Sequence, residues 1–351
     1  MNVLSSVFAG PFDAYWAQSI LRSVGVIAAV LLPAGTFVYL FLFKMVSFMQ
    51  NRLGPMEAGP YGSVQLLAEV GKSLQKEDVV PDRADRTLFK IAPYLVVGTV
   101  LLTYVVVPFG PDMVFIDSNV LGTGIFFVMA VSSISVIGII LAGWASASKF
   151  SLLGGLRAAG QLIAYELPLV LSVVGVVIQA GTLDLQKIVA AQANGEIFGW
   201  GALGNPYILT QGVALLIFMI AMQAELAQTP FDMPVAESEL VTGYMTEYTG
   251  LRFLLFFIGE FASAGAFSAI AATLWLGGWY LPGLDLTADY MNVVGPLVLL
   301  GKTMIFGGII FFVRFTYPRF REDQLQRFAW KILIPLALLN IFATGVLKVV
   351  F

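Results

Sequence analysis

Long apolar runs, separated by short polar islands, dominate the pattern of hydrophobic and polar positions along the chain. A helix that crosses a membrane needs about 20 mostly apolar residues, because each residue rises about 1.5 Å through roughly 30 Å of hydrocarbon. The runs of this length are Ser19–Met49, Leu88–Phe109, Gly122–Trp144, Gln161–Ala180, Tyr207–Leu226, Leu251–Leu276, Val293–Val313 and Phe328–Val350. The pattern predicts an all-α, polytopic membrane protein of about eight spans, with residues 1–351 in one transmembrane domain.

The first polar island, residues 50–87, contains one segment with helical periodicity. Its apolar positions recur every three or four residues, and they are Val64, Leu67, Ala68, Gly71 and Leu74. Polar residues occupy the opposite face. This arrangement predicts a short amphipathic helix at the membrane surface, with a solvated loop helix as the alternative.

Lysine and arginine are distributed unevenly between the two sides of the predicted bundle. The odd-numbered loops and their flanks hold Lys44, Arg52, Lys72, Lys76, Arg83, Arg86, Lys90, Lys149, Arg157, Arg252, Arg314, Arg319, Arg321, Arg327 and Lys331. The opposite side holds Arg22, Lys187 and Lys348. The positive-inside rule therefore places the odd loops in the cytoplasm and both termini on the outer side.

Composition narrows the chemistry that the chain can perform. Only 12% of its residues are charged, against about 25% in soluble proteins, and cysteine and histidine are both absent. Without these two residue types we expect no thiolate zinc site, no imidazole-ligated haem and no protein-ligated iron–sulfur cluster of the usual kind in this chain, and no residue is proposed as a metal ligand. Proton handling then falls to carboxylates, lysine or tyrosine, and electron carriers belong to partners. The net charge of −3 predicts no nucleic-acid partner.

The fifth loop, residues 227–250, is acidic although it is assigned to the cytoplasmic side. It contains Asp232, Glu237, Glu239 and Glu247 but neither lysine nor arginine. Apolar residues and prolines lie between these acids. We interpret the loop as a functional set of carboxylates, and a merely solvated acidic loop is the alternative.

Three further carboxylates lie within predicted spans. Glu225 is near a cytoplasmic end, and Glu166 and Glu260 lie roughly 8 and 14 Å deep. Each buried charge costs about 2.5–3.5 kcal/mol on insertion scales, so three of them indicate a function. Their graded depth suits a proton or charge relay, whereas polar contacts between helices are the alternative. Lys302, also within a span, is a candidate counter-ion for one of these acids.

Several strings of residues match one known family in its own order. They are QNRLGP at 50–55, AGPYG at 58–62, KEDVVP at 76–81, AGWAS at 142–146, KFSLLGGLRAA at 149–159, YELPL at 165–169, TPFDMP at 229–234, AESELV at 236–241, TEY at 246–248, GEF at 259–261 and RFTYPRFREDQL at 314–325. Together they resemble the H subunit of bacterial NADH:quinone oxidoreductase and subunit 1 of mitochondrial complex I.

The resemblance implies a subunit that lines a quinone-access tunnel and links quinone reduction to proton pumping through carboxylates. It implies a relay of Glu166, Glu225, Glu260, Asp232, Glu237, Glu239 and Glu247. It implies a quinone tunnel and docking surface that includes Arg52, Phe231, Asp232, Arg314, Arg319 and Arg321. Quinone is then a substrate, and NADH, FMN and iron–sulfur clusters lie on partner subunits. The isolated chain is expected to catalyse nothing.

Four places depart from the family's usual pattern. Leu42 and Phe43 replace a Glu-Arg pair, Met56 replaces an asparagine, Gln228 replaces an arginine and Val235 replaces a glutamate. All lie around the expected quinone chamber or its acidic link. We interpret the losses as offsetting pairs of opposite charge.

Two other functions remain compatible with the sequence. A related membrane subunit of a hydrogenase or of a ferredoxin-linked complex would share the fold and differ in its electron donor. A stand-alone proton-coupled transporter would also use acids within its spans, although no internal repeat favours it. The expected location is a bacterial-type plasma membrane, with the mitochondrial inner membrane as an alternative. The expected partners are the subunits around the quinone site and the neighbouring membrane-arm subunits.

Overall fold

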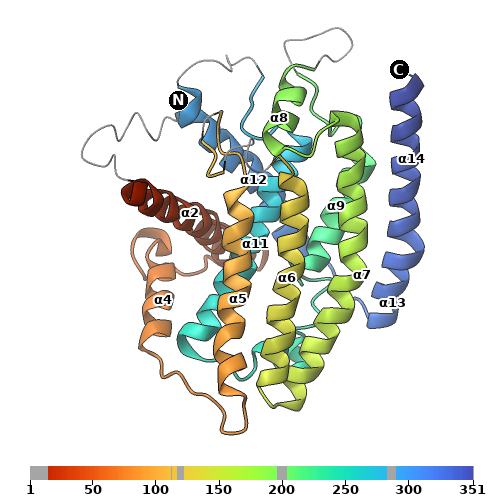
Figure 1. The fold of residues 1–351 in the computed structure, drawn as a ribbon. Helices are drawn as coiled ribbons and strands as arrows, with labels where there is room; N and C mark the ends of the chain where they lie inside the picture. Colours follow the sequence, from red (N-terminus) through yellow and green to blue (C-terminus); the bar gives the residue numbers. More distant parts are fainter. Residues whose placement is uncertain (1–14, 112, 117–121, 196–203, 283–289, 351) are drawn as a thin grey trace.

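The computed structural model describes residues 15–111, 113–116, 122–195, 204–282 and 290–350, and these residues contain helices and no strands. In chain order the helices are α2 (Tyr15–Phe37), a π-helical stretch (Val38–Met45), α3 (Val46–Met49), a 3-10 turn (Pro60–Gly62), α4 (Gln65–Gln75), α5 (Arg86–Val105), α6 (Gly124–Ala145), α7 (Lys149–Ala180), α8 (Leu185–Ala193), α9 (Gly212–Glu225), α10 (Glu237–Leu240), a second 3-10 turn (Gly243–Met245), α11 (Gly250–Trp275), α12 (Met291–Thr316), α13 (Glu322–Phe328), another π-helical stretch (Ala329–Leu333) and α14 (Ile334–Val350). Figure 1 shows them gathered into one bundle.

The prediction of a polytopic α-helical membrane protein is confirmed. Within the described residues, 7 helices are long and apolar enough to cross a membrane, and α9 is a shorter apolar helix. At 14 residues, α9 is roughly 21 Å long, so it is shorter than the predicted span Tyr207–Leu226. The chain makes turns before Gly212, where the Trp275 indole donates to the Gln211 carbonyl.

Helix α7 begins 12 residues earlier than the predicted span, at Lys149 rather than Gln161, and contains 32 residues. The glycine pair Gly154-Gly155 in this added segment is used for close packing. A Cβ at Gly154 would lie 2.6 Å from the Tyr244 backbone nitrogen, and Gly155 packs on Gly143 of α6. The long helix therefore continues beyond the predicted span and contacts the acidic loop directly.

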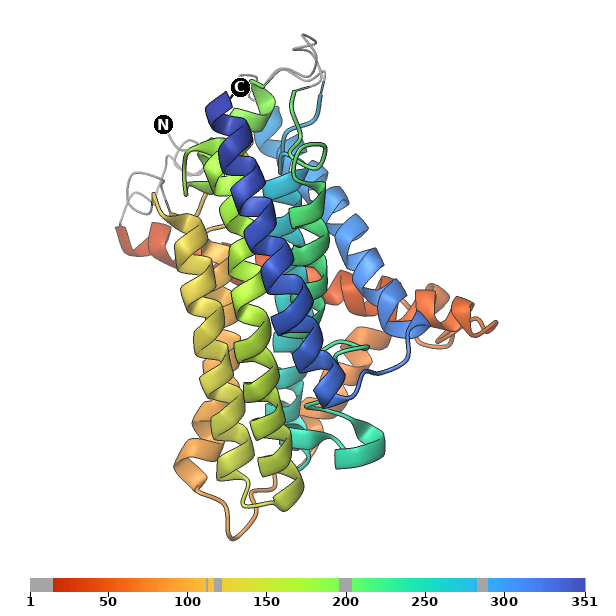
Figure 2. The same ribbon diagram turned by 90° about the vertical axis from the view of Figure 1, so that its right-hand side faces the viewer.

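Helix α2 and the stretch that follows it are strongly inclined to the other helices, as Figures 1 and 2 show. Helix α4 packs near α2 and α11 within the predicted loop 50–87. The predicted amphipathic helix is therefore present, but its apolar residues Leu67 and Leu74 point outward and are 69% and 61% exposed. Leu66 is the residue of α4 that packs against the core instead.

The two ends of the bundle differ. The loops before α5, between α6 and α7, and between α9 and α11 lie at one end, and α8 and the end of α14 lie at the other (Figure 1). Two lysines stabilise helix C-termini at the α8 end. Lys302 donates to the carbonyls of Leu276 (2.6 Å) and Gly278 (2.8 Å) at the end of α11, and to that of Tyr280. Lys348 donates to carbonyls at the end of α7.

The sequence suggested that Lys302 is a counter-ion for an acid, but the structure gives Lys302 other partners. Its ammonium group contacts backbone carbonyls, and no salt bridge joins it to an acid of the described residues. The C-terminus of a helix carries partial negative charge, which favours a cation there. Lys302 is therefore a helix cap between α12 and α11.

Candidate functional site

Three helices bring the predicted span acids towards one another. Glu166 lies in α7, Glu225 is the last residue of α9, and Glu260 lies in α11. Helix α7 packs against α9, where the Gln161 amide donates to the Ala224 carbonyl at 2.7 Å. The charges of Glu166 and Glu225 are close enough to interact.

Glu166 has a side-chain partner that the sequence did not single out. The Ser133 hydroxyl of α6 lies within hydrogen-bond distance of both the Glu166 carboxylate and the Met129 carbonyl, at 3.0 Å from the carbonyl. A hydroxyl both donates and accepts, so Ser133 can donate to an ionised Glu166 or accept from a protonated one. The neighbouring Ser132 donates to the same carbonyl but contacts no acid.

Glu225 and Glu260 line a common small cavity. Its volume is about 60 Å³, which has room for more than one water molecule, because one water needs roughly 10–15 Å³. Ser135 of α6, Ser263 of α11 and Tyr244 of the acidic loop complete its polar lining. One oxygen of Glu225 is buried without a hydrogen-bond partner in the protein. Burial raises the pKa of Tyr244, so its hydroxyl stays protonated at neutral pH.

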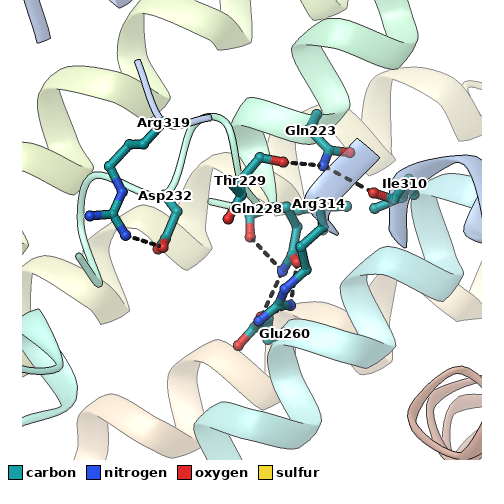
Figure 3. A network of polar contacts seen from close by, with 9 residues as sticks. Gln223, Gln228, Thr229, Asp232, Glu260, Ile310, Arg314 and Arg319 are labelled. Atoms are coloured by element: carbon teal, nitrogen blue, oxygen red, sulfur yellow. Dashed lines mark hydrogen bonds and ion pairs between the residues drawn. The ribbon is translucent and has the colours of Figure 1, made fainter. Parts of the chain in front are cut away.

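The carboxylate of Glu260 is held on its other side by a basic group. Arg314, at the end of α12, donates to it at 3.1 Å. Gln228 donates to the same carboxylate oxygen at 2.6 Å and accepts from Arg314, which closes a three-membered network (Figure 3). Glu260 is thus bound between the cavity and a residue that the sequence assigned to quinone docking.

The acidic loop owes its position to arginines from outside it. Arg319 pairs with Asp232 at 2.8 Å and donates to Ser238, and Arg157 of α7 pairs with Glu239. Burial raises the pKa of Asp232, which Arg319 opposes, whereas the hydrogen bond from Arg157 lowers the pKa of Glu239. The loop itself has no basic residue, and the arginines that pair with its acids come from α7 and from the segment after α12.

The two remaining loop acids lie apart from this cluster. Glu237 is exposed at the start of α10, and Glu247 is half-buried near the start of α11. Neither has a salt bridge within the described ranges. The geometry brings together Glu166, Glu225, Glu260 and Asp232, with Glu239 paired at the rim.

The residues expected at the quinone tunnel are dispersed. Arg314 and Arg319 belong to the cluster, but Arg52 is exposed and bonds Gln50, and Arg321 pairs with Asp323. Phe231 is buried in the core, where its ring packs between those of Tyr165 and Phe320.

A large apolar cavity lies elsewhere, between α2, α4 and α11. Its volume is about 710 Å³, and residues such as Leu66 and Val70 of α4 and Phe253 and Phe257 of α11 line it. Sequence reasoning missed these residues, because the cavity exists only through the inclination of α2. The sequence signal that could have pointed to the cavity is the break between the end of the first predicted span and the predicted amphipathic helix.

Helix α11 separates the two cavities. Phe253, Phe257 and Phe261 face the large apolar cavity, whereas Phe256, Glu260 and Ser263 face the small polar one. The first set is spaced by four and eight residues and the second by three, four and seven, which places each set on one face of the helix. A molecule in the apolar cavity is therefore one helix away from the Glu260 carboxylate.

The positions that depart from the family pattern are accommodated locally. Leu42 and Phe43 lie in the π-helical stretch and pack against the main core. Met56 lies beside Lys44, whose ammonium group donates to the Pro55 carbonyl at 2.8 Å. Val235 packs against a second apolar cluster that includes Tyr248 and Phe256.

No group of acids that could hold a metal ion occurs among the described residues.

Comparisons with known proteins agree with this architecture. The sequence model of the family described as NADH dehydrogenase matches residues 21–345. The chain is 42% identical to the second H subunit of the NADH-quinone oxidoreductase of Syntrophobacter fumaroxidans, over 93% of this chain and 95% of the relative. It is 43% identical to the H subunit of the Brevibacillus brevis enzyme over 92% of each chain. The chain therefore belongs to the NADH dehydrogenase family, together with the H subunits of bacterial NADH-quinone oxidoreductases.

Proposed function

We propose that this chain is the quinone-access and coupling subunit of a proton-translocating NADH-quinone oxidoreductase. The observation that carries the proposal is the division made by α11, with an apolar cavity on one face and Glu260 on the other. The names of the relatives place them in this enzyme. The division supplies the two sites that coupling needs, one for a lipid-soluble substrate and one for protons.

The apolar cavity suits the isoprenoid tail of a quinone. Its 710 Å³ lies within the range of ligand sites, and its lining is mostly aliphatic and aromatic. Lys72 and Lys76 stand at its rim beside Glu69, where a polar head group could pass. The chain has no cysteine or histidine to ligate an iron–sulfur cluster, and the clusters, NADH and FMN are all proposed to belong to partner subunits.

The proposed proton relay connects Glu166, Glu225 and Glu260. The first two are coupled across the contact of α7 with α9, and the small polar cavity joins the second to the third. Glu260 then contacts Arg314, which acts electrostatically on Asp232. Glu237, Glu239 and Glu247 are proposed as the cytoplasmic approach to this relay.

Coupling in this scheme is electrostatic. Reduction of the quinone by a partner's cluster creates a demand for protons and a transient negative charge near the basic group of Arg314 and Arg319. That charge competes with Glu260 and Asp232 for their arginines. Because carboxylates in a low-dielectric site interact strongly, a change at one of them redistributes protons along the others.

The proposed setting is a bacterial plasma membrane, with the acidic loop in the cytoplasm and both termini outside. The loops at the acidic end would then contact the subunits of the quinone site. The lateral faces would contact lipid and the neighbouring membrane-arm subunits.

The test is to replace Glu166, Glu225 and Glu260 singly by Gln in the complete complex. We expect each variant to assemble and to lose most proton translocation, measured on energised vesicles together with electron transfer from donor to quinone. Glu322→Gln is the control, because this acid is exposed at the start of α13. Normal pumping in all three variants would exclude the relay.

A further inference from the structure

Gln228 is the link between the relay and the arginines of the cytoplasmic side. Its side chain is 1% exposed. The amide nitrogen donates to Glu260 at 2.6 Å, and the amide oxygen accepts from Arg314 (Figure 3). Arg314 also donates to the same Glu260 oxygen at 3.1 Å. Three side chains from three elements therefore form a closed ring.

The direction of the amide is matched to the two charges. Its oxygen faces the guanidinium and its nitrogen faces the carboxylate, and a reversed amide would leave both buried atoms badly paired. The ion pair itself is partly exposed, with 26% of the Arg314 side chain and 24% of the Glu260 side chain accessible. A pair of this kind is weakly held when alone, so the buried amide fixes its geometry.

Other charged groups act on Glu260 from the elements around it. Glu225 of α9 shares its cavity, and Asp232 and Tyr244 of the acidic loop interact with it electrostatically. The lining of the cavity from α5 and α6 adds no charged residue. Among the described cations, Arg314 is the one paired with Glu260, and Gln228 decides how closely the two meet.

We propose that Gln228 is a positioning residue that holds Glu260 on Arg314 and thereby sets when Glu260 accepts a proton from the cavity. The inference rests on the relay under the proposed function. A proton that leaves the Glu225 carboxyl group and binds a Glu260 oxygen turns Glu225 into a carboxylate and Glu260 into a neutral acid. The ion pair with Arg314 is then lost, while the bond from Arg314 to the Gln228 oxygen remains.

The absence of charge on the Gln228 amide is also part of its proposed positioning role. An arginine, usual here in the resembling family, would add a second cation beside Arg314 and would compete for the Glu260 carboxylate. Val235, the other uncharged departure, packs in an apolar cluster and returns no acid to balance such a cation. Gln228 therefore adds no charge of its own to the pair of Glu260 and Arg314.

The deciding experiment compares two buried glutamines in the complete complex. Gln228→Met removes the contacts with Glu260 and Arg314, together with a 3.3 Å bond to the Leu226 carbonyl, with little change in volume. Gln223→Met is the matched control, because Gln223 is also buried but donates to the carbonyls of Thr229 and Ile310 and touches no acid (Figure 3). We expect Gln228→Met to shift the pH profile of coupled turnover by about half to one pH unit. Gln223→Met should keep the parental profile.

The same change in a Glu260→Gln background separates positioning from general damage. If Gln228 acts through Glu260, Gln228→Met adds no further shift to the pH profile of the electron transfer from donor to quinone that remains in this background, because the two effects are not additive. A full shift in that background, or an unshifted profile in the single variant, overturns the inference. If Gln228→Met does not assemble, Gln228→Leu also removes the contacts with Glu260 and Arg314 without adding a charge, and it is read by the same criteria.

The two proposals fail in different ways. If Glu260→Gln pumps normally, the relay is wrong and the role of Gln228 falls with it. If Glu260→Gln loses pumping while Gln228→Met has an unshifted profile, the relay stands and the positioning role alone is rejected.

Discussion

Glu166, Glu225 and Glu260 differ in how their carboxylates are satisfied. Glu166 has the Ser133 hydroxyl, Glu260 has a cation and an amide, and Glu225 keeps one buried oxygen without a protein partner. A buried acceptor without a partner is costly, and a buried water is the usual remedy. Glu225 is therefore the member of the set that depends most on the small cavity beside it.

Ser133 offers the sharpest test of a single residue. Ser133→Ala removes a hydrogen bond to a charged group, which is worth about 1.5 kcal/mol or more and changes an equilibrium about tenfold. We expect proton-coupled turnover in vesicles to fall by up to about tenfold, because Glu166 loses the partner that suits both of its protonation states.

Two variants control this change. Ser133→Thr keeps the hydroxyl and should retain most of the turnover. Ser132→Ala removes a bond to the same Met129 carbonyl without touching an acid, so it should have no effect. Equal losses in Ser132→Ala and Ser133→Ala would show that the serines serve helix packing only.

At the scale of elements, the acidic loop is held to α7 by the pair between Arg157 and Glu239. The hydrogen bond from Arg157 lowers the pKa of Glu239 below its usual 4.5. A lowered folded-state pKa stabilises the loop above the unfolded value, and this stability is lost as the pH falls through the lowered pKa. The pair is largely exposed, so its contribution is about 1 kcal/mol at most and is weakened by salt.

Glu239→Gln should therefore loosen the loop at neutral pH and low salt. We expect amide hydrogen exchange across residues 236–242 to rise by up to about fivefold, as a loss of about 1 kcal/mol allows. The difference should disappear at high salt and as the pH falls through the lowered pKa of Glu239. Glu237→Gln is the control, since Glu237 is exposed nearby and has no salt bridge. Equal hydrogen exchange in the two variants would show that the pair between Arg157 and Glu239 does not hold the loop.

The sequence predicts helices better than it predicts their partners. A membrane span is recognised by its length and apolarity, and an acid within it stands out, so both could be found. The start of α7 was missed because a span was sought by its apolarity, and the segment before Gln161 carries Lys149 and Arg157. Ser133 and Gln228 were not assigned roles, since uncharged polar residues are common and their acids lie 33 and 32 positions away.

For the whole molecule, the inclination of α2 is the feature that local sequence does not encode. An inclined α2 leaves the large cavity against α4 and α11, whereas the upright helices α5, α6 and α7 pack closely (Figure 2). The tilt of a membrane helix is set by its neighbours, not by its own composition. The proposed access route for quinone would thus be a property of the assembled bundle.

Gly35 of α2 lies in the wall of the large cavity, so a larger side chain at this position would narrow the proposed quinone route. A Cβ there would lie 3.2 Å from Leu66 of α4, so Gly35→Leu places a side chain inside the cavity. We expect the KM for a long-tailed quinone to rise roughly tenfold, which corresponds to about 1.4 kcal/mol, while a short-tailed analogue is much less affected. Gly301→Leu is the control, because Gly301 is an exposed helical glycine with open space around it. An equal change for both quinones would place the tail elsewhere, whereas a selective change would assign the cavity to the tail and not to the head group.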